Sequence, residues 1–155
     1  MMIERPKHSV MQASEMKWEK LTLLVDSGAS DTVVPQTVCP GAELHWTPKV
    51  GIEYEIADGG TLDNLGERRC LLKTSETANA KDAFMMAFQV VDVNKPLLSV
   101  FKVCEQGHSV LFEKDRGALL VQGDPKSRIE FRKVGGTYEL DVWLKPSESV
   151  FARPA

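Results

Sequence analysis

Short runs in which apolar and polar residues alternate are the feature that most limits how this chain can fold. The clearest run covers residues 137–144, and residues 128–132 and 52–56 repeat the pattern. A period of two gives a β-strand one buried face and one solvent face. Gly135-Gly136 separates two of these runs and Asp58-Gly59 follows the third, which indicates tight hairpin turns. Most of the chain is therefore predicted to be β-structure.

Two further strands and one helix complete the predicted elements. Residues 21–25 form an apolar run interrupted by one Thr, as expected for a strand buried on both faces, and residues 84–93 form a second run of strand length. Pro96 suits the first turn of a helix, and Gly107 is typical of a helix end. The apolar residues at helical spacing between them are Leu97, Val100, Phe101 and Cys104. We expect a helix of about ten residues here, within a small barrel or sandwich.

The composition limits the possible partners. The 155 residues are 43% apolar and 26% charged, as expected for one globular domain. The net charge of −3 provides no electrostatic attraction to nucleic acid or to an anionic membrane. The longest apolar run, residues 83–88, is far shorter than the about 20 residues of a membrane span. Because the first residues contain no apolar signal region, we expect a cytoplasmic, not secreted, protein with no nucleic-acid or membrane partner.

The residue types that bind metals are few and scattered. The three cysteines form no CxxC pair, and the three histidines have no partner at ligand spacing. They are Cys39, Cys70, Cys104, His8, His45 and His108. We predict no metal site, no cofactor and no disulfide framework, with thiols that are buried or half-buried in a reducing compartment. Core or packing roles are predicted for Trp18, Trp46, Trp143 and Met85-Met86.

One predicted strand ends in an acidic residue. Asp26-Ser27-Gly28 follows the apolar run of residues 21–25 and precedes a second apolar pair, Val33-Val34. Desolvation disfavours a carboxylate at the end of a dry strand, so such a group usually has a function. An ordinary Asx-type turn is the simplest alternative, and a phosphorylation-dependent degron would need its second serine one place later than Ser30. The apolar residues on both sides favour a buried loop over either alternative.

Residues 23–30, LLVDSGAS, resemble the active-site signature of the retropepsins, the aspartic proteases of retroviruses and LTR retrotransposons. Other features follow in the order that this family has. A hairpin over residues 52–72 is similar to the flap of the family, with Ala57-Asp58-Gly59-Gly60 at its tip. The strand at residues 84–93, an apolar turn, the helix and a last strand follow. The resemblance therefore covers roughly residues 21–112.

The sequence differs from the retroviral pattern at three points. Ser99 stands where the family has a glycine, and Val100 stands where it often has an arginine. The run of residues 95–100 is more similar to the Copia-type retrotransposon branch. Residues 113–155 continue past the point where retroviral enzymes end, and we expect residues 128–144 to extend the sheet at the base of a dimer. The predicted organisation is an N-terminal arm (1–20), a retropepsin core (21–112) and a C-terminal β extension (113–155).

The resemblance implies a fold and an activity. The fold is mainly β, a closed barrel with one short C-terminal helix and an extra C-terminal hairpin. The activity is that of an aspartic endopeptidase that cleaves extended polypeptide, with its own retroelement polyprotein as substrate, in the cytoplasm or inside a retroelement particle. Because the chain has one Asp-Ser-Gly loop and the mechanism needs two carboxylates, we expect a symmetric homodimer that pairs Asp26 of each copy. Ser27 and Gly28 would support this loop, Ser27 by a bond across the interface.

The resemblance also implies which residues surround the substrate. The loop after Gly28 would line the backbone of a peptide that binds as an added strand. The hairpin tip would close over the peptide, and three apolar side chains would shape its pockets. The loop residues are Ala29, Ser30 and Asp31. The tip residues are Ala57, Asp58, Gly59 and Gly60, and the pocket residues are Val33, Ile56 and Leu97.

Two other functions are compatible with the same residues. The chain could keep the retropepsin fold as a catalytically inactive dimerisation or peptide-binding module, or it could be a β-barrel binding protein unrelated to proteases. The intact Asp26-Ser27-Gly28 and Gly59-Gly60 segments favour an active enzyme over a decayed one. The third interpretation would make the whole ordered set of features a coincidence.

Overall fold

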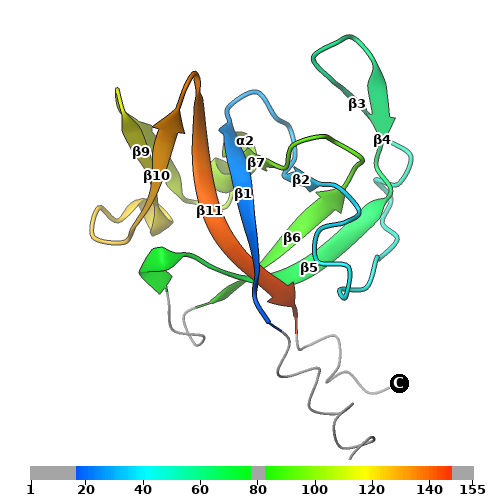
Figure 1. Ribbon diagram of the computed structural model, residues 1–155, viewed down its shortest axis with the longest axis horizontal. Coiled ribbons are helices and arrows are strands. Elements are labelled where there is room, and N and C mark those ends of the chain that lie inside the picture. The colour runs from blue at the N-terminus through cyan, green and yellow to red at the C-terminus, as the bar shows by residue number, and fades with distance from the viewer. Residues whose placement is uncertain (1–16, 78–82, 148–155) are drawn as a thin grey trace, which may run out of the picture.

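The computed structural model describes residues 17–77 and 83–147, which form a mainly β fold with one short α-helix (Figure 1). The strands are β1 Glu19–Asp26, β2 Val33–Val34, β3 Glu53–Glu55, β4 Thr61–Asp63, β5 Gly66–Lys73, β6 Phe84–Val90, β7 Leu97–Ser99, β8 Ser109–Phe112, β9 Arg116–Leu120, β10 Arg128–Val134 and β11 Thr137–Pro146. The helix is α2 Val100–Glu105, and two 3₁₀ turns are η1 Ser75–Thr77 and η3 Val121–Gly123. Among the described residues, no helix has the length and apolar character needed to cross a membrane.

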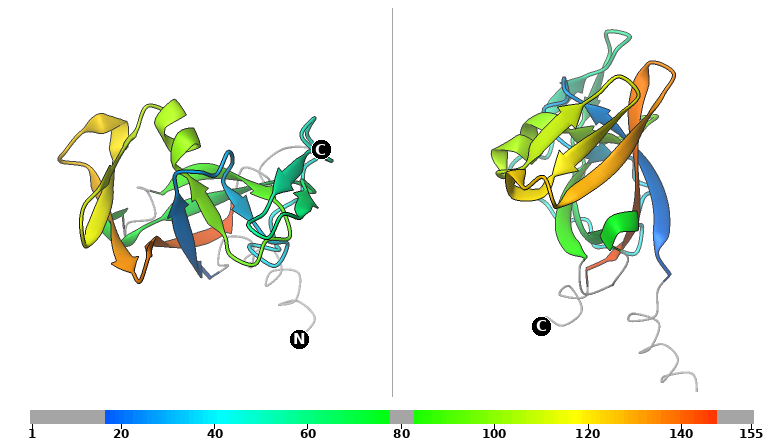
Figure 2. Two further views of the ribbon diagram at one scale, coloured as in Figure 1. Left: turned by 90° about the horizontal axis from the view of Figure 1, so that it is seen from above. Right: turned by 90° about the vertical axis from the view of Figure 1, so that its left-hand side faces the viewer.

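Nine of the strands form one sheet, in the order β1-β7-β2-β6-β5-β11-β10-β9-β8. β1 also pairs with β11, so β1 lies between β7 and β11 and the strand order closes into a ring. β3 and β4 form a separate two-stranded sheet. The views of Figures 1 and 2 show this hairpin and the β8–β10 strands at opposite ends of the molecule.

The core lies where the alternating runs of residues 128–132 and 137–144 predicted it. The run of residues 52–56 has no dry face, because Ile52 is 47% exposed and the β3–β4 hairpin stands apart from the large sheet. In β11, Leu140, Val142 and Leu144 are buried, and Leu144 pairs with Leu72 of β5. Phe88 of β6 is also fully buried. The prediction for residues 21–25 is only half right, because Leu23 and Val25 are buried while the other face of β1 is half-buried. In this chain β1 therefore has one buried face and one partly exposed face.

The predicted helix was wrong in its start and its face. Residues 97–99 form β7 instead, because they fit in parallel beside β1, where Asp26 lies opposite Ser99. The helix begins only at Val100, and the Ser99 hydroxyl caps it by accepting the Lys102 N–H at 3.1 Å. Val103 is its buried residue, whereas Phe101, expected on the inner face, is exposed. The ladder bonds to β1 outweigh the local preference that Pro96 creates for a helix.

The C-terminal hairpin is present, and its second strand lies inside the sheet of one chain. β10 and β11 are antiparallel and joined by Gly135-Gly136, where Gly135 has a φ of +60° that favours glycine. β11 pairs with β5 and β1 as well as with β10. β1 therefore ends at Asp26 beside the β10–β11 turn, as Figure 1 shows. Of the predicted N-terminal arm, residues 1–16 lie outside the described residues, and β1 already begins at Glu19.

Three predictions of burial were wrong. Cys104 is exposed, although Cys39 and Cys70 are buried as expected. Trp46 is 75% exposed and Met85 is 47% exposed, so neither is a core residue. Cys39 and Cys70 lie against each other, and their mutual hydrogen bond and burial raise the pKa of Cys70 well above its ordinary value. That thiol is therefore held in its neutral, unreactive form.

Candidate active site

A cleft of about 840 Å³ collects most of the predicted site residues. It is bounded by the loop after β1, by the β3–β4 hairpin and by residues 91–97. The predicted residues that line it are Asp26, Gly28, Ala29, Ser30, Asp31, Val33, Ile56, Ala57 and Leu97. The predicted residues that do not line it are Ser27, Asp58, Gly59 and Gly60. Its volume lies within the range of ligand-binding clefts.

Asp26 is the last residue of β1 and lies half-buried in the wall of this cleft. One carboxylate oxygen, Oδ1, accepts the N–H of Gly28 at 2.7 Å. This contact is the geometry of an Asx turn, so the simplest alternative interpretation of the sequence is also present in the structure. The turn leaves the carboxylate directed by the backbone of its own loop rather than by a neighbouring cation.

The loop after Asp26 is held in place by Ser99. The Ser99 hydroxyl donates to the carbonyl of Ala29 at 2.6 Å, and the Ser99 N–H donates to the hydroxyl of Thr32 at 3.0 Å. Ser99 is fully buried, so these bonds form in a dry environment where they are strong. The sequence comparison identified Ser99 only as a departure from a family pattern. The structure gives it a function, which is to tie the loop to β7 and α2.

The predicted hairpin is present and shorter than expected. Glu53 pairs with Asp63 and Glu55 pairs with Thr61, whereas β5, included in the prediction, belongs to the large sheet. The N–H of Ile56 donates to the carbonyl of Gly60 at 2.9 Å, which closes the turn. Gly59 has a φ of +92°, a conformation that favours glycine. The tip is exposed to solvent, and the inward side of the hairpin carries Tyr54 and Leu62 into the cleft.

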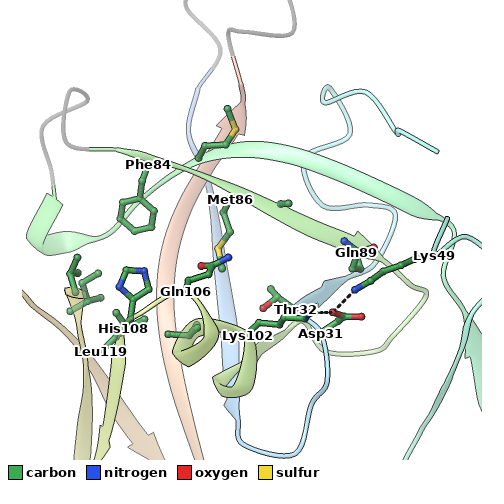
Figure 3. A pocket seen from close by; sticks show the side chains of 15 residues that line it. Asp31, Thr32, Lys49, Phe84, Met86, Gln89, Lys102, Gln106, His108 and Leu119 are labelled. Atoms are coloured by element: carbon green, nitrogen blue, oxygen red, sulfur yellow. Dashed lines mark hydrogen bonds and ion pairs between the residues drawn. The ribbon is translucent and has the colours of Figure 1, made fainter. Parts of the chain in front are cut away.

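Asp31 is the most enclosed charge of the cleft. Its side chain is 10% exposed, and its Oδ1 accepts the Lys49 ammonium at 2.9 Å. Its other oxygen, Oδ2, accepts the Tyr54 hydroxyl at 2.8 Å, and Lys102 of α2 lies 3.7 Å from Oδ1. Figure 3 shows the carboxylate between the two lysines. Both oxygens of the Asp31 side chain therefore already have protein partners, while the residue lines the cleft. Its place beside a substrate backbone stays a prediction.

Tyr54 was not among the predicted site residues. Burial, and secondarily the hydrogen bond and charge of Asp31, raise its pKa to about 12, although the Asn64 amide acts in the opposite direction. The phenol therefore keeps its proton and acts as a donor over the whole physiological range. The alternation of residues 52–56 does place Tyr54 on the inner face of its strand, but it gives no indication of its partner.

Two further hollows adjoin the cleft residues. A pocket of about 480 Å³ lies between β6 and α2, with Phe84, Met86 and Leu119 along it and Asp31 at one end (Figure 3). A depression of about 450 Å³ contains Asp26 and Ser27 and is completed by Phe112, Thr137 and Tyr138. Ser27 thus faces away from the cleft, toward the β10–β11 turn. Across the described residues, no cluster of three or more His, Cys, Asp or Glu side chains could hold a metal ion.

No protein-family model, curated protein or solved structure matches this chain. The function is therefore argued from the residues of the cleft and the chemistry that they permit.

Proposed function

We propose that this chain is an aspartic endopeptidase of the retropepsin type that acts as a symmetric homodimer. The observation that carries the proposal is the position of Asp26, at the end of a sheet strand and in the wall of a cleft that a hairpin covers. An extended peptide fits such a cleft because it can add its backbone to exposed strand edges. The segments that the resemblance assigns to the loop, the flap and the pockets all contribute to this one cleft.

The sheet topology supports the corresponding barrel. The pairings form a ring from β1 through β7, β2, β6, β5 and β11 back to β1, so each of these strands has a neighbour on both sides over part of its length. We interpret this ring as the closed barrel of the proposed class, with β8–β10 as an appended ribbon. The helix α2 follows β7, in the order that the resemblance implies.

The proposed mechanism uses two Asp26 carboxylates and one water molecule. As in aspartic proteases generally, two carboxylates at short distance cannot both ionise, so they share one proton and titrate as a unit. The ionised member takes a proton from the water, whose oxygen attacks the scissile carbonyl carbon, and the protonated member gives its proton to the carbonyl oxygen. The tetrahedral intermediate then collapses: one hydroxyl gives its proton to the ionised carboxylate, the C–N bond breaks, and the departing nitrogen takes the proton held by the other carboxyl group.

The second carboxylate has to come from a second copy. The chain contains one Asp-Ser-Gly sequence. Asp26 and Ser27 both line the depression beside Phe112 and Tyr138, on the side away from the cleft. Phe112 is 40% exposed there, and burying such an apolar side chain stabilises an interface. We propose this depression as the side from which the partner approaches, with the protein's own polyprotein as substrate and the cytoplasm or a retroelement particle as the location.

The decisive experiment compares wild type with Asp26→Asn on a mixed peptide library at about pH 5. Asparagine is nearly isosteric, so folding and dimerisation should persist while cleavage disappears. The specific activity of the wild type should also rise with enzyme concentration, because the site requires two copies. Cleavage by both proteins would refute Asp26 as the catalytic group. An activity that increases steadily to about pH 9 would refute the shared proton, which is lost above the upper apparent pKa of the dyad.

A second function remains a specific alternative. The Gly28 N–H already occupies one oxygen of Asp26, as in a purely structural turn. A catalytically inactive dimerisation or peptide-binding module would use the same cleft without the reaction. A dimer in sedimentation that binds peptides and cleaves none of them would identify this function.

A further inference from the structure

The β3–β4 hairpin has few attachments to the rest of the protein. It forms its own two-stranded sheet, and Glu53, Glu55, Thr61 and Asp63 are exposed. At its base, backbone bonds join Asn64 to Gly51 and Ile52, and the N–H of Leu65 donates to the carbonyl of Val90 at 2.8 Å. These bonds all lie at the base of the hairpin. A contact further along the hairpin can fix its angle over the cleft more firmly than contacts at the base.

Tyr54 makes the contact that does so. Its hydroxyl donates to Asp31 Oδ2 at 2.8 Å, from the middle of β3 to the floor of the cleft. A hydrogen bond to a carboxylate is roughly twice as strong as one between neutral groups. The Lys49 ammonium, 2.9 Å from the other oxygen, stabilises the charge that the hydroxyl binds. This hydrogen bond therefore contributes substantially to the position of the hairpin.

Hydrogen bonds of the Asn64 side chain orient the Tyr54 hydroxyl. The Asn64 side-chain amide donates to the hydroxyl oxygen at 3.0 Å and to the Gln89 side chain at 2.8 Å. The Asn64 Oδ1 accepts the Gly66 N–H at 2.8 Å, so this fully buried side chain has partners on both of its polar atoms. A completely satisfied buried network has one preferred arrangement. The hydroxyl is thus directed at Asp31 before any ligand enters.

Asp31 connects the hairpin to the loop that carries Asp26. Thr32, the next residue, holds the Ser99 N–H at 3.0 Å, and Ser99 in turn holds the carbonyl of Ala29. A continuous set of hydrogen bonds therefore connects the hairpin to the Asp26 loop, through Asp31, Thr32 and Ser99. A lid attached in this way is positioned relative to the reacting group rather than only to the sheet.

We propose that the Tyr54–Asp31 hydrogen bond is a latch that holds the β3–β4 hairpin over the cleft. Tyr54 and Asp31 are then positioning residues, and Asp31 acts through the hairpin rather than by touching substrate. The latch itself is a property of the fold, and its effect on peptide turnover rests on the proposed protease function. When the latch is closed the cleft is covered, and when it opens a polypeptide can enter from the side.

The test is Tyr54→Phe, which keeps the ring and removes the hydroxyl. Thr22→Val is the matched control, because the Thr22 hydroxyl also donates to a carboxylate, that of Asp141 at 2.7 Å, away from the cleft. Hydrogen–deuterium exchange of the full chain should be about tenfold faster at the hairpin amides of residues 53–63 in Tyr54→Phe and unchanged there in Thr22→Val. Equal hairpin exchange in the two variants overturns the latch.

Kinetics separate a latch from a catalytic group. A lid that is closed in a smaller fraction of molecules lowers apparent affinity by that fraction, so the KM of Tyr54→Phe should rise about tenfold while kcat changes less than about twofold. A fall in kcat at constant KM overturns the positioning role. If wild type cleaves no peptide but the exchange difference persists, the protease function fails and the latch stands. If wild type cleaves and the exchange difference is absent, the latch fails alone.

Discussion

The nine-stranded sheet and the β3–β4 hairpin are stabilised by different kinds of contact. The sheet encloses fully buried apolar side chains such as Leu23, Phe88 and Leu144. The outward residues of the hairpin strands are exposed, and the hairpin depends on polar bonds such as the part-buried Tyr54–Asp31 bond. Apolar burial sums over many contacts and resists local change, whereas a few polar bonds can open at small cost. The rigid part therefore carries Asp26, and the part that can move covers it.

The largest effect is expected from Phe88→Ala, which removes a fully buried side chain of β6. The free energy of unfolding should fall by about 3–5 kcal/mol, because transfer and cavity terms add. Phe84→Ala on the same strand is the control. Phe84 is 40% exposed, so its loss should cost about 1 kcal/mol or less. Urea denaturation at one protein concentration measures both, and similar losses would contradict the distinction between buried and exposed positions of this sheet.

A loss of stability of intermediate size is expected from a change at Ser99, which joins the sheet to the loop of the cleft. Ser99→Ala removes the donor to the Ala29 carbonyl and the cap of α2, so the free energy of unfolding should fall by about 1–2 kcal/mol. Peptide cleavage should fall as well, because the Asp26 loop loses a tie. Ser109→Ala, at an exposed serine of β8, should change stability by about 0.5 kcal/mol or less. Thermal melts with parallel activity assays test this, and an unaltered activity in Ser99→Ala would show that the loop is held without Ser99.

The smallest effect is expected from a polar contact on the outside of the sheet. Hydrogen bonds from Arg132, and secondarily from Thr22, hold the pKa of Asp141 below its usual value against the opposing effect of burial. A lowered folded-state pKa contributes stability above the ordinary aspartate pKa, and this contribution is lost as pH falls through the lowered value. Because Arg132 is 51% exposed, Asp141→Asn should cost no more than about 1 kcal/mol.

Urea denaturation of wild type and Asp141→Asn at about pH 7 and about pH 2 measures this contribution. The difference between the two proteins should be present at the higher pH and vanish at the lower one. A difference that persists in acid would show that packing, and not charge, is what Asp141 provides. The result also gives a reference value for the stability that Asp31 contributes. Like Asp141, Asp31 is bound by one cation and one hydroxyl group, but its side chain is more buried.

The strands that could be predicted are those whose burial repeats locally. Residues 128–132 and 137–144 alternate, and the structure confirms a strand over each run and the glycine turn between them. The helix prediction failed at residues 97–99, where pairing with a strand more than seventy positions away along the chain determines the conformation. The burial prediction for Trp46 failed for a similar reason. The local sequence around a large aromatic side chain does not indicate that the fold leaves it exposed.

The candidate site could be predicted only where its residues lie in one segment. The loop from Asp26 to Asp31 and the hairpin are continuous in sequence, and both were identified there. Lys49, Tyr54 and Lys102 were missed, because each becomes important only through its distance to Asp31. No spacing rule joins these positions, so the sequence contains no signal for the contact.

The sequence by itself determined the alternating strands at residues 128–132 and 137–144, the glycine turns at residues 58–60 and 135–136, and the position of Asp26 at the end of a strand with a buried face. These properties follow from the period of the apolar residues and from the conformational freedom of glycine, both of which act over a few neighbouring positions. The tertiary structure decided that β7 replaces the first turn of the predicted helix, that β11 pairs with β1, and that Tyr54 meets Asp31. Those outcomes depend on contacts between residues distant along the chain, whose energies exist only after the chain has folded.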